Sequence, residues 1–275
     1  SRLRHRRIAQ PTTLSMTSTV RPLRLGIAAL VAVLCLVPFA YLAMLSMSTE
    51  WAFPALWPET LTLDLWATVL GGPNALVASL VLSLVISTTV AVGSTAAGYL
   101  TGKFIAYHPQ RKRLLVLAYV PFAMSPVILG VCLMYLYLRA DLTGSVLGVI
   151  LAQSMFAYGY AIVFFSAFWN ARLKALEDLV ATLGGTSWDA YRRVLLPMSK
   201  EPLLICFFQT FLISWFQYGL TLLIGSGKVQ TLPLKVYDYV TEANMYYAAL
   251  ASCLLVLPPA LLLWVNKRFV FSRQS

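Results

Sequence analysis

Residues 75–100 read ALVASLVLSLVISTTVAVGSTAAGYL, and this run of apolar and small side chains contains no charged residue. A helix of about 20 residues crosses the hydrocarbon core of a bilayer, which is roughly 30 Å thick. Strands of a membrane barrel would instead alternate in polarity over about 10 residues, and this run does not. The stretch therefore predicts a transmembrane helix.

Five further charge-free stretches repeat this pattern. The six predicted spans are residues 25–47, 75–100, 114–138, 145–169, 203–224 and 246–265. The composition agrees, because only 11% of the side chains are charged, whereas a soluble domain averages roughly 25%. The hydrophobic content is 59% and the mean hydropathy is +0.76. A water-soluble globule and a disordered chain are thereby excluded, and we expect an all-α polytopic membrane protein with six transmembrane helices.

The basic residues of this 275-residue chain are distributed unevenly, and the formal net charge is +11. Eighteen of the 21 Lys and Arg precede the first span, follow the last one, or lie between spans two and three or four and five. The positive-inside rule assigns these segments, and both termini, to the cytoplasm. The net charge is thus a topology signal, and nucleic acid is not an expected partner.

The head of the chain, residues 1–24, is predicted to be a cytoplasmic segment ahead of one transmembrane domain over residues 25–270. Residues 1–15 are basic and polar and lack an initiator Met, so we expect Met16 to be the natural start. The first span has no small-residue cleavage site, which indicates an anchor and not a removable signal peptide. The four cysteines fall within spans and the two histidines stand alone, so neither a disulfide framework nor a metal site is expected.

Residues 171–201, between spans four and five, read ARLKALEDLVATLGGTSWDAYRRVLLPMSKE. Leucines recur at helical spacing in the first half, and Gly184-Gly185 then favours a helix end, because Gly adopts the left-handed conformation without steric cost. Thr186 and Asp189 have the spacing of a capping box for a second short helix, with Pro197 as its predicted end. This pattern predicts a helical hairpin on the cytoplasmic surface. Periodicity alone leaves open an amphipathic element that lies in the headgroup layer.

The same residues resemble the EAA loop of ABC-importer permeases. The family pattern is Glu-Ala-Ala, three residues, Gly, nine residues and Ile-x-Leu-Pro. Here Gly184 and Leu196-Pro197 match with the same spacing, although Asp178 stands where the family has Glu and Leu-Val where it has two Ala. Residues 214–233 are also similar to the fifth span and outer loop of a branch that serves polyamines, ferric iron, thiamine, sulfate and related solutes. The resemblance covers about residues 25–270 and implies the type I importer fold.

The resemblance implies a permease subunit in the bacterial inner membrane that forms half of a translocation pathway. Its expected partners are a second identical or homologous permease chain, two cytoplasmic ABC ATPase subunits and an extracytoplasmic solute-binding protein. The solute expected first is a polyamine such as spermidine or putrescine, with iron(III), thiamine, sulfate or another small solute as alternatives. The residues that this resemblance assigns to ATPase coupling are Asp178, Gly184, Gly185, Trp188, Tyr191, Arg192, Arg193, Leu196 and Pro197.

The chain itself is expected to be no enzyme and to bind no cofactor, because partner subunits would hydrolyse ATP with Mg²⁺. Its only Walker-like string, residues 225–229, lacks the Ser or Thr that should follow Lys228 to reach Mg²⁺. The rival class is a secondary transporter or channel that acts without ATP. That class predicts ionisable residues at the span centres, and the sequence has none.

Polar side chains within the spans are candidates for the solute pathway. The resemblance favours Gln217, with Trp215 and Tyr218, and Ser125 is a further candidate. Three other polar residues are explained as well by hydrogen bonds between helices; these are Gln153, Gln209 and Thr210.

Glycine and proline positions predict how the spans pack and bend. Gly98-x-x-x-Gly102 predicts close approach of two helices. Prolines predict breaks or kinks in spans three and six; they are Pro121, Pro126, Pro258 and Pro259. The outer segments 48–74 and 225–245 are long enough for short surface helices.

Overall fold

The computed structural model describes residues 17–48, 51, 57–58, 60–72 and 74–270, so the predicted extension, residues 1–15, lies outside the described part. Every named element in that part is a helix, which confirms the predicted all-α class. Four helices are individually long and apolar enough to cross a membrane. They are α1 (Thr17–Ser46), α3 (Ala75–Tyr107), α6 (Val146–Phe168) and α13 (Met245–Val270).

The two remaining predicted spans are bent pairs of helices. α4 (Arg111–Ala123) and α5 (Pro126–Arg139) meet at 98°, and α10 (Lys200–Trp215) and α11 (Gly219–Gly225) meet at 59°. Six spans are present when each bent pair counts as one. The break that prolines predicted in the third span is confirmed, whereas the sequence predicted no break in the fifth span.

The break between α4 and α5 follows from Pro126, which stands in the first turn of α5. Proline is tolerated there because its missing N–H would have no partner in the first turn, and its ring keeps the preceding residue out of the α conformation. Ser125 accordingly has φ −62° and ψ 144°. The break between α10 and α11 was not predicted, because it contains no proline.

α13 continues as one helix through Pro258 and Pro259, so these prolines do not break the sixth span. Pro259 has no N–H to give to the carbonyl oxygen of Leu255, four residues before it. The indole Nε1 of Trp215 on α10 donates to that oxygen at 2.9 Å. A neighbouring helix thus satisfies the carbonyl that proline leaves free, as membrane helices require.

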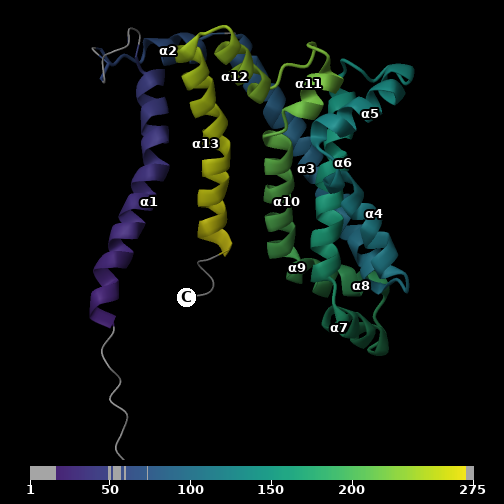
Figure 1. The fold of residues 1–275 in the computed structure, drawn as a ribbon. Helices are drawn as coiled ribbons and strands as arrows, with labels where there is room; N and C mark the ends of the chain where they lie inside the picture. The colour runs from purple at the N-terminus through teal and green to yellow at the C-terminus, as the bar shows by residue number, and fades with distance from the viewer. Residues whose placement is uncertain (1–16, 49–50, 52–56, 59, 73, 271–275) are drawn as a thin grey trace, which may run out of the picture.

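Short helices occupy the connections. α2 (Asp64–Leu70) and α12 (Leu232–Thr241) confirm the surface helices predicted in the two outer segments. The hairpin segment 171–201 contains α7 (Ala171–Thr182), α8 (Ser187–Ala190), the π-helical segment η1 (Tyr191–Leu195) and α9 (Leu196–Met198), and it runs into α10. α7 and α8 lie at the same end of the molecule as the start of α1 and the end of α13, whereas α2, α11 and α12 lie at the opposite end (Figure 1). This relative sidedness agrees with the charge distribution, and the cytoplasmic position of that end stays a prediction.

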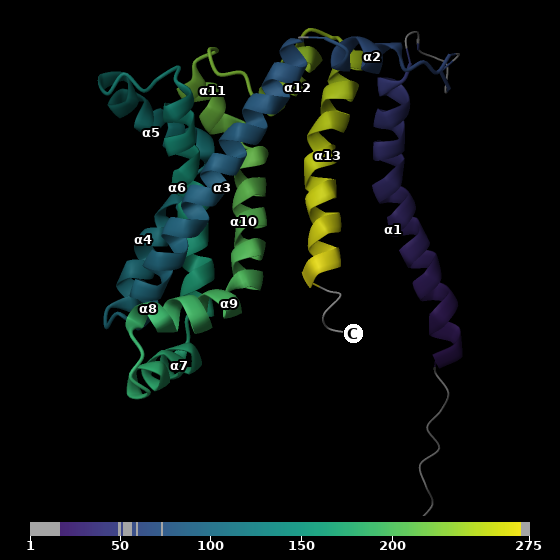
Figure 2. The same ribbon diagram turned by 180° about the vertical axis from the view of Figure 1, so that it is seen from behind.

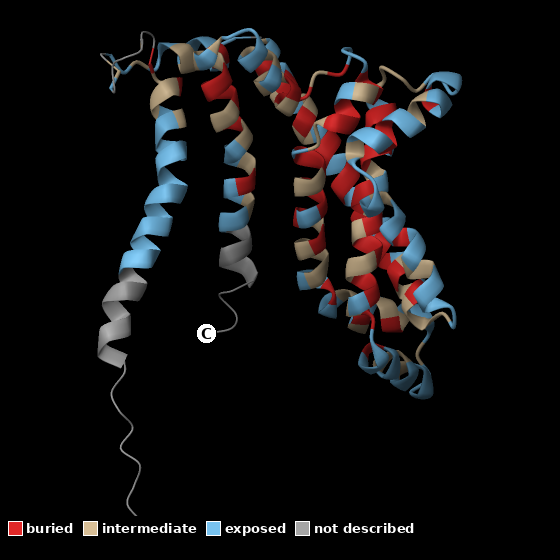
Figure 3. Cartoon of the chain, in the orientation of Figure 1, coloured by how far each residue is buried: buried red, intermediate tan, exposed pale blue. Residues whose placement is uncertain are grey.

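α3, α6 and α10 form a packed group, while α1 and α13 stand to one side of it (Figures 1 and 2). Buried residues concentrate in that group, and α1 is exposed over most of its described length (Figure 3). The predicted close approach at Gly98 and Gly102 is confirmed between α3 and α6. A Cβ at Gly102 would lie 2.6 Å from the Cβ of Phe165, and one at Gly98 would overlap with Ala161.

Candidate functional site

The first helix of the hairpin is defined by a cap at each end. Asn170 precedes α7, and its Oδ1 accepts hydrogen bonds from the backbone N–H groups of the second and third residues after it, at 3.0 and 3.2 Å. At the other end, the Gly185 N–H reaches the Val180 oxygen at 2.9 Å and the Gly184 N–H reaches the Ala181 oxygen at 3.1 Å. This is the paired bonding of a Schellman motif. Gly184 has φ +81°, which confirms the left-handed turn predicted for it.

The second helix begins with the predicted capping box. The Asp189 N–H donates to Thr186 Oγ1 at 3.2 Å, while Asp189 Oδ2 accepts from the Thr186 hydroxyl at 2.6 Å and from its N–H at 3.2 Å. These hydrogen bonds stabilise the charged carboxylate, and they lower the pKa of Asp189 below its ordinary value. The turn of the hairpin is therefore fixed on both sides, by the glycines before it and the capping box after it.

Pro197 does not end the second helix as predicted. The helix passes through it by widening, because residues 191–195 form a π-helical segment in which the Leu196 N–H bonds to the Tyr191 oxygen. In a regular α-helix the ring of Pro197 would press on the carbonyl of the residue four positions earlier. The wide turn relieves that contact, and the chain continues to Ser199 and into α10.

The outer surface of the hairpin carries large apolar side chains that are exposed in the described part of the chain. Leu179 is 54% exposed, Leu183 79% and Trp188 66%, and we call these three residues the tip. Charged side chains that the sequence assigned to coupling are exposed around it: Asp178, Arg192 and Arg193. Arg193 also lies 3.4 Å from Asp189. A cluster of exposed apolar side chains with a charged rim is the usual composition of a protein-binding surface.

The inner surface of the hairpin packs on the membrane helices. Tyr191 stacks on Trp188, with ring centroids 5.7 Å apart, and its other neighbour is Tyr99 on α3, at 6.2 Å. Leu195 is fully buried in the same cluster. Leu196 is half-buried and Pro197 exposed. The predicted coupling residues thus divide between an outer surface at Trp188 and an inner contact through Tyr191.

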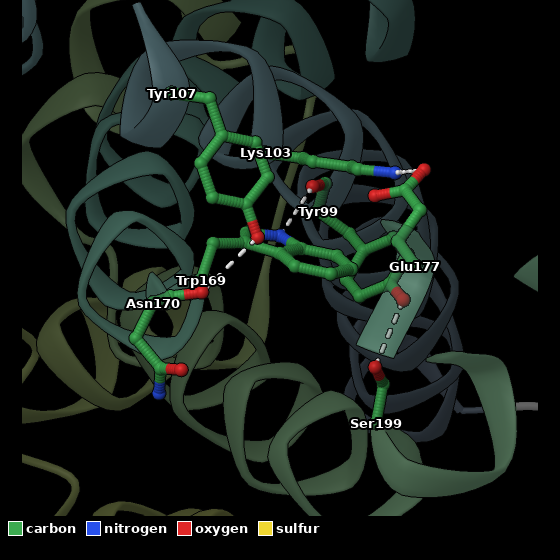
Figure 4. A network of polar contacts seen from close by, with 7 residues as sticks. All are labelled: Tyr99, Lys103, Tyr107, Trp169, Asn170, Glu177 and Ser199. Atoms are coloured by element: carbon green, nitrogen blue, oxygen red, sulfur yellow. Dashed lines mark hydrogen bonds and ion pairs between the residues drawn. The ribbon is translucent and has the colours of Figure 1, made fainter. Parts of the chain in front are cut away.

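A polar network joins the hairpin to the end of α3 (Figure 4). Tyr99 Oη lies 2.8 Å from Ser199 Oγ, and Lys103 Nζ lies 2.7 Å from Glu177 Oε1. The Lys103 ammonium is also 5.3 Å from the ring centroid of Trp169, the residue that follows α6. These contacts connect α3 to the hairpin and to the end of α6, which are far from α3 in the sequence, and so they fix the hairpin relative to the packed group.

Sequence reasoning missed this network. The signal that could have found it is the spacing Tyr99, Lys103, Tyr107, which puts polar side chains on one helix face just where a span leaves the membrane. A row of polar side chains on one face of an otherwise apolar span indicates that another element of the protein packs there.

The predicted pathway residues are brought together only in part: Trp215 and Gln217 line one small cavity. Trp215, on α10, is buried and contacts α13, whereas Ser125 is exposed at the break between α4 and α5. Tyr218 is half-buried, with its ring 5.2 Å from that of Tyr237. Gln217 lies at the α10–α11 break, and its buried Nε2 has no hydrogen-bond partner among the described residues.

At the centre of the packed group, the Gln153 side chain on α6 forms hydrogen bonds to α10 and α11. Its Nε2 donates to Thr221 Oγ1 at 2.9 Å, and its Oε1 accepts from Ser214 at 2.5 Å. The interhelical role that the sequence allowed for Gln153 is thus present. Thr210 similarly lies 3.1 Å from Thr95 on α3, whereas Gln209 is exposed.

The long apolar helices, with two of the spans broken, define a helical, multi-pass membrane protein. A firmly capped hairpin lies outside the spans and offers a surface for a partner. The model of one family, the binding-protein-dependent transport system inner membrane component, matches residues 93–271. The chain belongs to this family and is an inner-membrane protein. The matched region begins within α3 and includes the hairpin, the network and both bent pairs.

Individual proteins are similar over shorter stretches. A probable molybdenum ABC transporter permease protein of Haloferax volcanii is 29% identical over 57% of this chain and 61% of its own length. A sulfate transport system permease protein of Synechococcus elongatus is 30% identical over 50% of this chain and 52% of its own length. The chain thus spans about half to three fifths of those two relatives. A molybdenum transport system permease protein of Mycobacterium tuberculosis is 28% identical over 65% of this chain and 75% of its own length.

A solved structure supports the fold. It is the crystal structure of a bacterial ABC transporter involved in the import of the acidic polysaccharide alginate, and the similarity covers 96% of this chain with a TM-score of 0.67. The sequence identity is 16%, so this similarity bears on the fold alone. The importer fold that the EAA-like residues implied is confirmed.

Proposed function

We propose that this chain is one of two permease subunits in an ATP-driven importer of a small oxyanion such as molybdate or sulfate. The observation that carries the proposal is the hairpin, with its uncovered apolar tip, in a chain of this transport family. The expected assembly contains a second permease chain, identical or homologous, two cytoplasmic ATPase subunits that hydrolyse ATP with Mg²⁺, and an extracytoplasmic solute-binding protein.

The tip is suited to an ATPase groove because its shape is fixed before binding. Gly184 and the Thr186–Asp189 capping box fix the turn, so little conformational entropy is lost when Trp188 docks. A large aromatic side chain in a preformed position is typical of the residues that dominate binding energy. The exposed Arg192 and Arg193 would form the polar rim of that contact.

Movement of the hairpin would reach the membrane helices by two routes. The backbone joins α7 to α6 and α9 to α10, and Tyr191 transmits contact from Trp188 to Tyr99 on α3. When the two ATPase subunits close on ATP, the hairpins of the two permease chains would approach each other. The packed groups would then tilt and open the shared pathway to the other side of the membrane.

An oxyanion replaces polyamines as the first expected solute. The similar proteins carry molybdenum and sulfate in their names. The spans contain no acidic residue, so a polyammonium solute would meet no carboxylate. An oxyanion offers only hydrogen-bond acceptors, and the Nε2 group of Gln217 is a buried donor without a partner among the described residues.

The test is uptake by a reconstituted complex. The chain should be purified with the ATPase and the binding protein encoded beside it and placed in vesicles loaded with ATP. We expect ATP-dependent uptake of radiolabelled molybdate or sulfate, with no uptake of spermidine. Uptake of spermidine alone would refute the oxyanion assignment. Uptake that continues unchanged without ATP would favour the rival class, a secondary transporter or channel.

A further inference from the structure

The hairpin has a link to α3 that the backbone does not provide. Its two ends are joined covalently to α6 and α10, whereas α3 lies earlier in the sequence. Lys103, near the end of α3, reaches Glu177 on α7 with a 2.7 Å ion pair. This ion pair is a direct side-chain contact between α7 and α3, in addition to the packing of α3 on α6.

The Lys103 ammonium is held from two sides. Glu177 Oε1 is its acidic partner, and the face of Trp169 lies 5.3 Å away. Trp169 is itself rigid, because its side chain is buried (1% exposed) and its Nε1 donates to the backbone carbonyl oxygen of Tyr99 at 3.2 Å. A cation between a carboxylate and an aromatic face has little freedom to follow other partners. The contact thus has one preferred geometry.

The pair is also shielded from water. The two side chains are each 26% exposed, whereas the neighbouring Asp178 is on the exposed side of α7. An ion pair that is partly desolvated is coupled more strongly than one at the open surface, and removal of one partner leaves the other charge without compensation. Two adjacent acids on α7 therefore differ: Asp178 is free for a partner protein, and Glu177 is held by this chain.

A second contact fixes the other end of the hairpin to the same helix. Tyr99, one turn before Lys103, meets Ser199 at 2.8 Å, and Ser199 stands between α9 and α10 (Figure 4). The Ser199 hydroxyl is fully buried and lies 2.6 Å from the Leu195 oxygen. α3 thus contacts the hairpin at its first helix and at its exit.

We propose that Lys103 and Glu177 are positioning residues for energy coupling: their ion pair fastens α7 to α3, so that movement of the docked hairpin turns α3 together with α6 and α10. Neither residue contacts ATP or solute in this role. The proposal rests on the function proposed above, and it predicts a defect in how much solute is moved per ATP, not in docking.

The test uses the complete complex in vesicles. Lys103→Met and Glu177→Gln should keep ATPase co-purification, because the tip is unchanged, while the number of solute molecules imported per ATP hydrolysed falls about fivefold, in the range typical of coupling between contacting side chains. Lys103→Arg should retain most of the ratio. The charge-exchanged double variant, Lys103→Glu with Glu177→Lys, should regain more of it than either single exchange. Lys112→Met is the matched control, because that exposed lysine stands in the first turn of α4 on the same side of the molecule.

The outcomes separate the proposals. A normal import-to-hydrolysis ratio in Lys103→Met and Glu177→Gln would overturn the positioning role, and so would an equal loss in Lys112→Met. If instead both variants lose the ATPase, the pair is needed to build the hairpin and the coupling role is refuted. A wild-type complex that shows neither ATPase association nor uptake would refute the proposed function itself.

Discussion

The α3–α6 contact buries its apolar surface within this chain, whereas the tip of the hairpin exposes it. At Gly98 and Gly102 side-chain volume is removed, so that two helix backbones touch within this chain. At the tip, Leu179, Leu183 and Trp188 keep their volume and are exposed in the described part of the chain. The first contact is complete in one subunit, and the second is the surface for which we propose an ATPase partner. Substitutions at the two places should therefore separate folding from assembly.

The largest effect is expected at the complete contact. Gly98→Leu would force a side chain into Ala161, whose backbone carbon lies 3.0 Å from an added Cβ, so neither helix can yield without moving. We expect a cost of about 3 kcal/mol or more, as for severe overpacking. Size-exclusion chromatography in detergent and thermal unfolding would show loss of the monodisperse protein.

Gly93→Ala is the matched control on the same helix. A Cβ there meets nothing within 4 Å, so the folded yield should be unchanged. Equal damage from both substitutions would mean that glycine is needed along α3 for a reason other than contact with α6.

The next largest effect is expected at the turn that presents the tip. Gly184→Val places a β-branched residue at φ +81°, which costs on the order of 1–3 kcal/mol of backbone strain. We expect the variant to insert in the membrane and to lose the ATPase on co-purification. Gly184→Asn should retain it, since Asn tolerates the left-handed region. Normal co-purification of the Val variant would disprove the docking assignment.

A smaller effect is expected when only the surface is changed. Trp188→Ala removes an exposed ring and leaves both caps in place, so the fold should persist while affinity for the ATPase falls by about 2 kcal/mol, the scale of an interface hot spot. Binding in detergent by surface plasmon resonance would measure it. Trp57→Ala, at another exposed tryptophan between α1 and α2, should bind as the wild type does.

The smallest effect concerns pH. The Thr186 hydrogen bonds lower the pKa of Asp189, so the capping box gains stability above the ordinary Asp pKa and loses it only as the pH falls through the lowered value. A titration of the Asp189 carboxyl by NMR should therefore have its midpoint below the usual Asp range. Thr186→Ala should move that midpoint upward, and an unchanged midpoint would remove the capping box as its cause.

The sequence predicted local features whose cause is local. The six apolar stretches, the Gly184 turn and the Thr186–Asp189 capping box each depend on residues within a few positions of one another, and the structure contains all of them. The glycine spacing at Gly98 and Gly102 also predicted close packing, although the partner helix, α6, could not be named.

Features that depend on distant residues were missed. α13 passes Pro259 because Trp215, on another helix, supplies a donor to the Leu255 carbonyl. The same contact explains why Trp215 is buried among helices. The family resemblance had instead suggested that Trp215 lines the solute pathway. The Lys103–Glu177 pair likewise joins residues 74 positions apart. No window along the sequence contains both members of such pairs.

The π-helical segment gives the spacing of the EAA-like motif a geometric meaning. Between Gly184 and Val194 the chain counts nine residues, as the family pattern does, and the wide turn at residues 191–195 lies across the end of that count. In an α-helix each residue turns the chain by about 100°, so one residue fewer would rotate Trp188 to a different side of the helix that passes through Pro197. The nine-residue spacing therefore determines the direction in which Trp188 points about the helix axis. A protein that keeps the count keeps the direction of its aromatic side chain relative to the membrane helices, whatever residues fill the positions between.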